Sequence, residues 1–234
     1  MKNPGYYPGY SVMSQQRFWD EATRKLIRDR VANVPPYRFF SPEEARLLEA
    51  VCDHIIPQDD RDTASRIPIA PHIDKRLAAH KIPGYRFEDM PPDEEAFRLG
   101  LQAIDQIAQH LHQRAFTGLT ALQQDLIIEM LHDGKPPAAG EIWKRMPVHR
   151  FWALLVQDCV EGYYSHPSSW DEIGYGGPAY PRGYMRLENG QPEPWEVEEQ
   201  RYQWSAPADS VSDRYKPIGG HPEDQPAQGQ EGTH

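Results

Sequence analysis

The sequence contains only two cysteines, Cys52 and Cys159, in 234 residues. Both lie in apolar surroundings with helical spacing, which is typical of small buried thiols. A disulfide between them is the alternative, because the sequence does not set the distance between their Cα atoms. No Cys-x-x-Cys-His motif is present, so the chain has no covalent haem of its own.

Long apolar runs are also missing. No stretch reaches the roughly 20 apolar residues that span a bilayer, so we expect no direct membrane span. The first ten residues lack the apolar core of a signal peptide and contain no twin arginine. By itself the sequence therefore predicts a cytoplasmic protein. The alternative is a periplasmic location, reached by export with a signal-bearing partner.

Basic charge is in short supply. The formal net charge is -10, which argues against a nucleic acid partner, because phosphate binding needs a basic face. Hydrophobic residues make up 38% of the chain, below the usual globular share, yet 11% aromatic residues are too many for a mostly disordered chain. Together these values predict a modest core with extended polar or aromatic segments at its ends.

Alternating strand patterns are absent, and we expect an all-α protein: an irregular bundle of about six or seven helices. Residues 15–34 read as a first helix with a stripe of Phe18, Ala22, Leu26 and Val31. Ser41-Pro-Glu-Glu44 is a capping box at the start of the next helix, and Thr120 caps a later one. Further helices are expected near residues 72–80, 94–114, 141–146 and 147–164.

The domain organisation follows from the same pattern. We expect an N-terminal arm over residues 1–13 and a helical domain over residues 14–187. Residues 188–234 are rich in Pro, Gly, Gln and acidic residues, which predicts an extended and partly disordered tail.

Catalytic motifs are missing as well: there is no Gly-x-Gly-x-x-Gly, no phosphate loop and no Gly-x-Ser-x-Gly. The best metal candidate is Glu129-Met-Leu-His132, a Glu-x-x-His pair on one helix face. Di-iron carboxylate bundles use two such pairs and two further glutamates. A ferritin-like di-metal oxidase is therefore one alternative function, although a simple polar pair near a helix end is the more ordinary interpretation.

Residues 162–184 are unusually rich in glycine, proline and aromatic residues, with five glycines, three prolines, five tyrosines and a tryptophan. We expect an ordered, irregular loop, because Gly and Pro fix the backbone while aromatic rings supply contact area. The rings either cover the chain's own core or anchor an interface, as Tyr, Trp and Arg commonly do. His166 is a weak candidate for catalysis. The expected interface anchors are Trp170, Tyr175, Tyr180, Arg182 and Tyr184.

Two stretches carry a family resemblance. Residues 38–57, Arg-Phe-Phe-Ser-Pro-Glu-Glu-Ala-Arg-Leu-Leu-Glu-Ala-Val-Cys-Asp-His-Ile-Ile-Pro, resemble the opening of the gluconate 2-dehydrogenase subunit 3 family. Residues 162–184, with Gly-Tyr-Tyr-Ser-His-Pro and Gly-Tyr-Gly-Gly-Pro-Ala-Tyr-Pro-Arg-Gly-Tyr, resemble its closing motif. The similarity covers roughly residues 38–187.

The resemblance implies a small accessory subunit, often called gamma, without a cofactor of its own. Such subunits partner a large flavin-dependent dehydrogenase of the glucose-methanol-choline type, which holds FAD and oxidises sugars or sugar acids. In many complexes a multihaem cytochrome c subunit takes the electrons onward. The small subunit supports folding and stability of the large one. A free-standing helical protein that binds a small molecule remains a further alternative.

Overall fold

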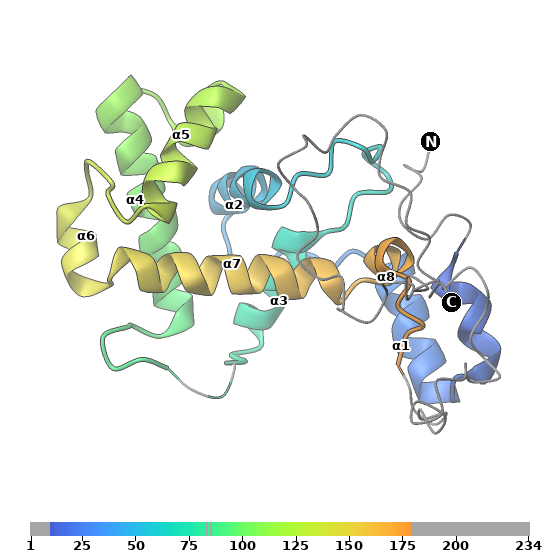
Figure 1. Ribbon diagram of the computed structural model, residues 1–234. Coiled ribbons are helices and arrows are strands. Elements are labelled where there is room, and N and C mark those ends of the chain that lie inside the picture. The colour runs from blue at the N-terminus through green and yellow to red at the C-terminus, as the bar shows by residue number, and fades with distance from the viewer. Residues whose placement is uncertain (1–9, 83, 85, 179–234) are drawn as a thin grey trace, which may run out of the picture. The chain divides into compact units, whose positions relative to one another are not determined.

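The structure is a computed structural model that describes residues 10–82, 84 and 86–178. This part of the chain is helical and contains no strand, which confirms the all-α prediction (Figure 1). The described helices, including two short 3-10 segments η1 and η2, are η1 Val12–Phe18, α1 Glu21–Ala32, α2 Pro42–Ile55, α3 Ile69–Ala78, α4 Asp93–His112, η2 Phe116–Gly118, α5 Ala121–His132, α6 Gly140–Arg145, α7 Val148–Tyr164 and α8 Pro167–Ile173.

Two helix starts are confirmed by their capping contacts. The Ser41 hydroxyl accepts the Glu44 N–H and the Glu44 carboxylate accepts the Ser41 N–H, which closes a capping box at α2. Thr120 and Gln123 form the equivalent box at α5. Each box satisfies two backbone donors that a helix start leaves without intrahelical partners.

The first helix differs from its prediction in both length and orientation. The expected helix over residues 15–34 is divided into η1 and α1, because the Asp20 side chain accepts the Thr23 N–H and starts a new helix there. The expected apolar stripe is also wrong: Leu26 and Val31 are exposed, whereas Ile27 and Trp19 are buried. The face that packs inward is therefore the neighbouring one.

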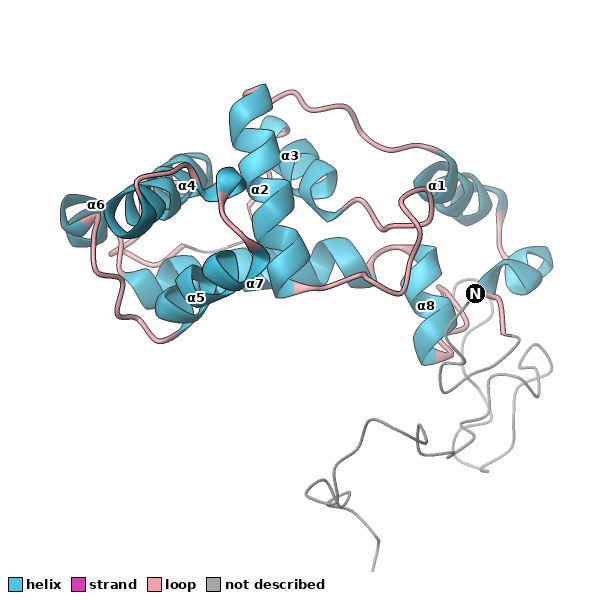
Figure 2. Cartoon of the chain, turned by 90° about the horizontal axis from the view of Figure 1, so that it is seen from above, coloured by secondary structure: helices cyan, strands magenta, loops and turns pink. Residues whose placement is uncertain are grey.

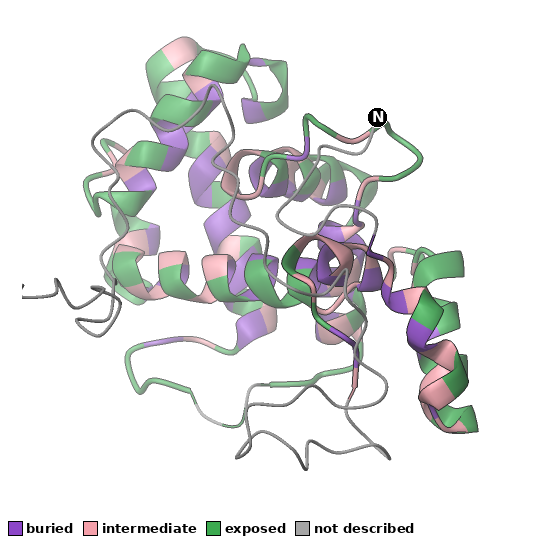
Figure 3. Cartoon of the chain, turned by 45° about the vertical axis from the view of Figure 1, so that its right-hand side comes forward, coloured by how far each residue is buried: buried purple, intermediate pink, exposed green. Residues whose placement is uncertain are grey.

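Helix α7 lies at the centre of the main core. It contacts α2, α3, α4, α5 and α8, with α4, α5 and α6 gathered around its N-terminal part and α8 following its C-terminal end (Figures 1 and 2). Buried positions concentrate where the helices face one another (Figure 3). The largest fully buried side chains of this core include Phe97, Phe116, Phe151, Leu48, Ile104 and Leu131.

A second, smaller cluster joins the beginning and the end of the described chain. Trp19 and Ile27 from the N-terminal segment pack with Trp170 of α8, and Tyr10 and Val12 complete the cluster. Two hydrogen bonds tie the same segments together: the Val12 N–H donates to the Asp171 carboxylate at 2.6 Å, and the Tyr10 hydroxyl donates to the Tyr175 carbonyl at 3.1 Å.

Close packing of α4 on α7 depends on Gly100. A Cβ atom at this position would lie 2.0 Å from Cζ of Phe151. The Phe151 ring cannot move aside easily, because it is fully buried between Phe97 and Trp143. Glycine thus lets the two helices approach one another.

We therefore expect Gly100→Ala to lower the free energy of unfolding by about 2–3 kcal/mol, at the upper end of the cost of overpacking a core. Urea denaturation at 25 °C measures the change. Gly118→Ala is the matched control, because its added Cβ would meet nothing within 4 Å. Equal effects of the two substitutions would show that the α4–α7 contact tolerates a methyl group.

Candidate functional site

The segment expected as an irregular loop, residues 162–184, is partly helical. Its first residues complete α7, and residues 167–173 form α8, with Pro167 at the first helical position. Gly174 ends α8 in the left-handed region with a φ of 66°. Proline at the first helical position and glycine just after the last one are ordinary helix signals, so the sequence did indicate a short helix between Pro167 and Gly174.

Among the expected interface anchors, Trp170 faces inward. Its side chain is only 6% exposed, and its indole N–H donates to the Tyr164 carbonyl at 2.6 Å. The ring meets Tyr175 edge to face, with centroids 5.3 Å apart, while Tyr175 itself is 40% exposed. Trp170 thus covers this chain's own core, as the self-packing interpretation expects. Tyr180, Arg182 and Tyr184 lie outside the described residues.

His166 caps α8 and holds it against α1. Its Nδ1 accepts the Ser168 N–H at 3.2 Å, and its Nε2 lies 3.1 Å from the Arg30 carbonyl. These two partners require the neutral ring with the proton on Nε2. Burial lowers the pKa of His166, which favours the same neutral form. Both ring nitrogens are therefore engaged in structural contacts, and the arrangement adds no support for a catalytic role.

The other candidates also have structural surroundings. His132 Nδ1 lies 3.1 Å from the Asp133 carboxylate, and its ring meets Trp152 edge to face. Within the described residues no group of three or more His, Cys, Asp or Glu side chains is placed to hold a metal ion. Glu129 and His132 therefore belong to no such group. Cys52 and Cys159 are both buried and unbonded, with their sulfur atoms 3.7 Å apart.

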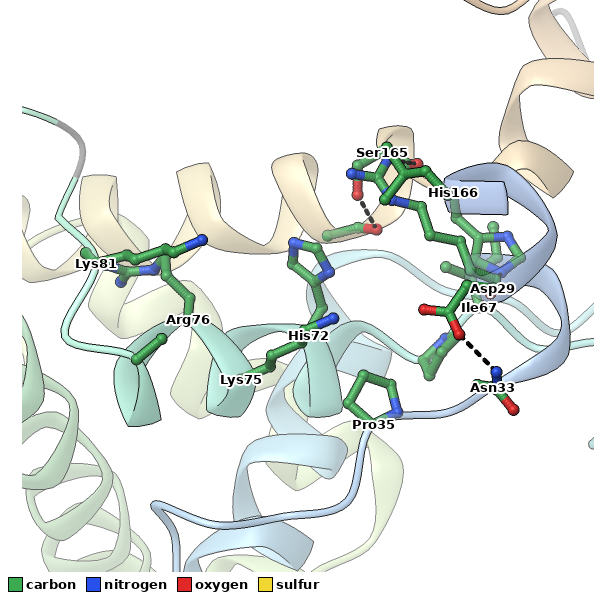
Figure 4. Close-up of a pocket in the computed structure, with 15 residues that line it drawn as sticks. Asp29, Asn33, Pro35, Ile67, His72, Lys75, Arg76, Lys81, Ser165 and His166 are labelled. Atoms are coloured by element: carbon green, nitrogen blue, oxygen red, sulfur yellow. Dashed lines mark hydrogen bonds between the residues drawn. The ribbon is translucent and has the colours of Figure 1, made fainter. Parts of the chain in front are cut away.

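A groove lies between α1 and α3 and is closed at one end by the α7–α8 junction. Asp29 and Asn33 project from α1, His72 and Lys75 from α3, and Ser165 and His166 from the junction (Figure 4). Its volume is about 400 Å³, and a second hollow of about 530 Å³ continues it past Val34 and Arg38. We call these two hollows the α1–α3 groove.

The α1–α3 groove is basic, although the protein as a whole is acidic. Five cations line it, namely Arg30, Arg38, Lys75, Arg76 and Lys81, against one carboxylate, Asp29. Burial lowers the pKa of His72, and the neighbouring Arg30 and Lys75 lower it further, as expected beside positive charge.

The side chains of Arg30 and Arg76 bind groups of the chain itself, whereas those of the two lysines of the groove bind none among the described residues. Arg30 donates to the Ser165 carbonyl at 2.7 Å, and Arg76 pairs with two buried aspartates. Lys75 and Lys81 are exposed and form no ion pair within the described part of the chain. The groove therefore offers two uncommitted ammonium groups to an external anion.

An exposed apolar surface adjoins the groove. Leu26, 52% exposed, lines it from α1, and Val34, 65% exposed, lines its continuation. Sequence periodicity placed Leu26 in the core and missed this surface. The groove itself was not predictable from the sequence, because Asp29, His72 and Ser165 come together only through tertiary packing.

Comparison with known proteins decides the family. The model of the family described as Gluconate 2-dehydrogenase subunit 3 matches residues 42–177. The chain belongs to this family. The match runs from the first residue of α2 through α8, so it overlaps most of both stretches that carried the resemblance, at residues 42–57 and 162–177.

As a member of the gluconate 2-dehydrogenase subunit 3 family, the chain is a subunit of a multi-subunit dehydrogenase. Searches of the curated proteins and of the solved structures gave no match. Among the described helices, none combines the length and apolar character that a membrane crossing requires.

Proposed function

We propose that this chain is a non-catalytic accessory subunit that binds, stabilises and helps to fold a large FAD-dependent dehydrogenase of the glucose-methanol-choline type. That partner oxidises sugars or sugar acids and holds the flavin. A multihaem cytochrome c is the expected further partner for the electrons. The observation that carries the proposal is the family match over residues 42–177.

Stabilisation follows from selective binding. A subunit that binds only the folded dehydrogenase favours that state by mass action, by about 2.7 kcal/mol when its concentration is 100 times Kd. No cofactor in this chain is needed for that effect. The relevant property is the surface that it presents to the partner.

The α1–α3 groove is our candidate for that surface, and its proposed occupant is an acidic segment of the large subunit. Lys75 and Lys81 supply positive charge without internal partners, while Leu26 and Val34 supply adjoining apolar area. Interfaces commonly combine an apolar centre with complementary charge at the rim. The basic groove also contrasts with a net charge of -10, so it would orient an acidic segment toward this face.

Co-expression with a candidate FAD-dependent dehydrogenase from the same genome tests the function. We expect the two chains to co-purify, and the dehydrogenase to unfold at a higher temperature in the complex than alone. A dehydrogenase that is equally soluble and equally stable without this chain would overturn the proposal. Point variants are preferable to removal of residues 165–187, because that deletion would also remove α8 and its buried Trp170.

The double variant Lys75→Glu and Lys81→Glu is expected to weaken the complex by about tenfold or more, most strongly at low salt, because charge reversal opposes an acidic partner. Isothermal titration calorimetry at two salt concentrations measures this. The control is Lys135→Glu with Lys144→Glu, two exposed lysines outside the groove. If both double variants bind alike while the complex persists, the groove is not the docking surface, although the accessory function stands.

A further inference from the structure

The two cysteines of the chain lie opposite each other in the main core. Cys52 is on α2 and Cys159 on α7, separated by 107 positions in the sequence, yet their sulfur atoms are 3.7 Å apart. Their side chains are 3% and 0% exposed. Helices α2 and α7 pack directly on each other.

The remaining gap is small. A disulfide has a sulfur–sulfur distance of roughly 2.05 Å, so the two atoms need to approach by about 1.7 Å from the observed 3.7 Å. Rotation about the Cα–Cβ bonds moves each sulfur atom without moving its helix. No residue lies between the two sulfur atoms, because they are already in hydrogen-bonding contact.

We propose that Cys52 and Cys159 are a disulfide site that links α2 to α7 when the chain folds in an oxidising compartment. The proposal is independent of the accessory function, since it concerns only the stability of this chain. The redox state of this cysteine pair also distinguishes a cytoplasmic from a periplasmic location, because cytoplasmic thiols stay reduced whereas periplasmic ones are oxidised.

The oxidant is a small or protein disulfide, such as oxidised glutathione or a thiol oxidoreductase. One cysteine thiolate attacks a sulfur of that disulfide, which forms a mixed disulfide and releases one thiol. The second cysteine thiolate then attacks the mixed disulfide and releases the other thiol. The two cysteines thus lose two protons and two electrons, and the oxidant's disulfide is reduced to two thiols.

Timing is set by burial. The hydrogen bond with Cys159 and burial raise the pKa of the Cys52 thiol, so the folded core holds little of the reactive thiolate. Oxidation is therefore fast while the chain is unfolded or partly open and slow once the core has closed. A chain that folds under reducing conditions stays a dithiol for long after it meets an oxidant.

The bond would stabilise the folded chain by restricting the unfolded one. A loop of about 100 residues is among the larger ones for which this effect is described, so we expect the oxidised protein to unfold at a temperature about 5–15 °C higher. The effect requires no new contact in the native core.

The experiment uses the full chain, unfolded in guanidinium with reductant and then refolded in a buffer of reduced and oxidised glutathione. We expect a monomer about 2 Da lighter, without titratable thiols, and a cross-linked peptide pair containing Cys52 and Cys159. A second sample, folded under reductant and then given the same buffer, is expected to oxidise at least tenfold more slowly.

Cys52→Ser and Cys159→Ser are the controls, and each is expected to show the same unfolding temperature with and without reductant. If a serine variant does not fold, the wild-type chain in its two redox states still gives the comparison. Two free thiols after oxidative refolding, disulfide-linked dimers in place of the internal bond, or an oxidised monomer that is no more stable would each overturn the proposal.

Discussion

Replacing Asp74 with alanine is expected to lower the free energy of unfolding by about 3–5 kcal/mol. The Asp74 side chain is fully buried in α3. Its Oδ1 accepts the N–H groups of Phe39 and Phe40 at 3.0 and 2.9 Å, and its Oδ2 accepts that of Arg38 at 2.7 Å. Alanine leaves three backbone donors without their carboxylate; the Phe40 N–H is buried and the other two are partly buried, and an unsatisfied buried donor costs about 1–3 kcal/mol.

The damage should extend beyond the three hydrogen bonds. Residues 38–40 lead directly into the Ser41 cap of α2, and the Phe40 ring packs in the main core against Phe97. Asp74→Asn should fall between wild type and alanine, because the amide keeps one acceptor oxygen but points an NH2 group at a donor. Urea denaturation compares these with Asp59→Ala, whose side chain is 91% exposed. Similar losses for Asp74→Ala and Asp59→Ala would show that the three hydrogen bonds accepted by Asp74 are dispensable for stability.

Replacing Arg76 with methionine is the second large effect, expected to cost about 3–5 kcal/mol at pH 7.5, as breaking a buried ion pair commonly does. The guanidinium lies 2.7 Å from the Asp93 carboxylate and 2.5 Å from that of Asp158, and all three side chains are largely buried. Methionine occupies similar space but leaves two carboxylates close together without their cation.

This loss should depend on pH. Burial raises the pKa of Asp158 to about 6 in the folded protein, even though Arg76 opposes the shift, while Glu161 and Asp93 add to it. A raised folded-state pKa means that this group contributes most to stability below its unfolded value, about 3.9, and that the contribution is lost as the pH rises through about 6. Without Arg76 the pKa rises further, so protonation relieves the variant more than the wild type.

We therefore expect the difference in unfolding free energy between wild type and Arg76→Met to shrink by about 1–2 kcal/mol between pH 7.5 and pH 5.5. Denaturation curves at the two pH values measure it. Arg76→Lys, which keeps a positive charge, should show a smaller loss and a weaker dependence on pH. A constant gap for the methionine variant would mean that Asp158 is not the group that responds.

The sequence predicted well those features of the fold that depend on residues within a single helix. The capping box at Ser41 depends on residues three positions apart and formed as expected, and Thr120 caps α5 as expected. The inward face of α1 was not predictable in the same way. Its apolar residues cover two neighbouring faces, and only contact with Trp170, more than 140 positions later, selects Ile27 over Leu26.

The candidate site likewise has features that nearby residues predict and features that depend on distant contacts. The composition of the aromatic segment predicted order, and its described part, residues 162–178, is structured. The partners of Trp170 in the second cluster, Trp19 and Ile27, were not predictable from that segment. The α1–α3 groove is assembled from α1, α3 and the α7–α8 junction. The run Arg24-Lys-Leu-Ile-Arg-Asp-Arg30 marks the first helix as locally basic in the sequence, but the net charge does not, and the meeting of this helix with Lys75 and Lys81 depends on the fold.

The second cluster also imposes an order of events on a newly made chain. Its hydrogen bonds join residues 159 and 165 positions apart, so the N-terminal partners leave the ribosome long before α8 exists. Since synthesis proceeds from the N-terminus, Trp19 and Ile27 must wait with their apolar faces uncovered until translation is well past residue 170. This cluster therefore cannot close until α8 has been synthesised, after every buried residue of the main core has been made.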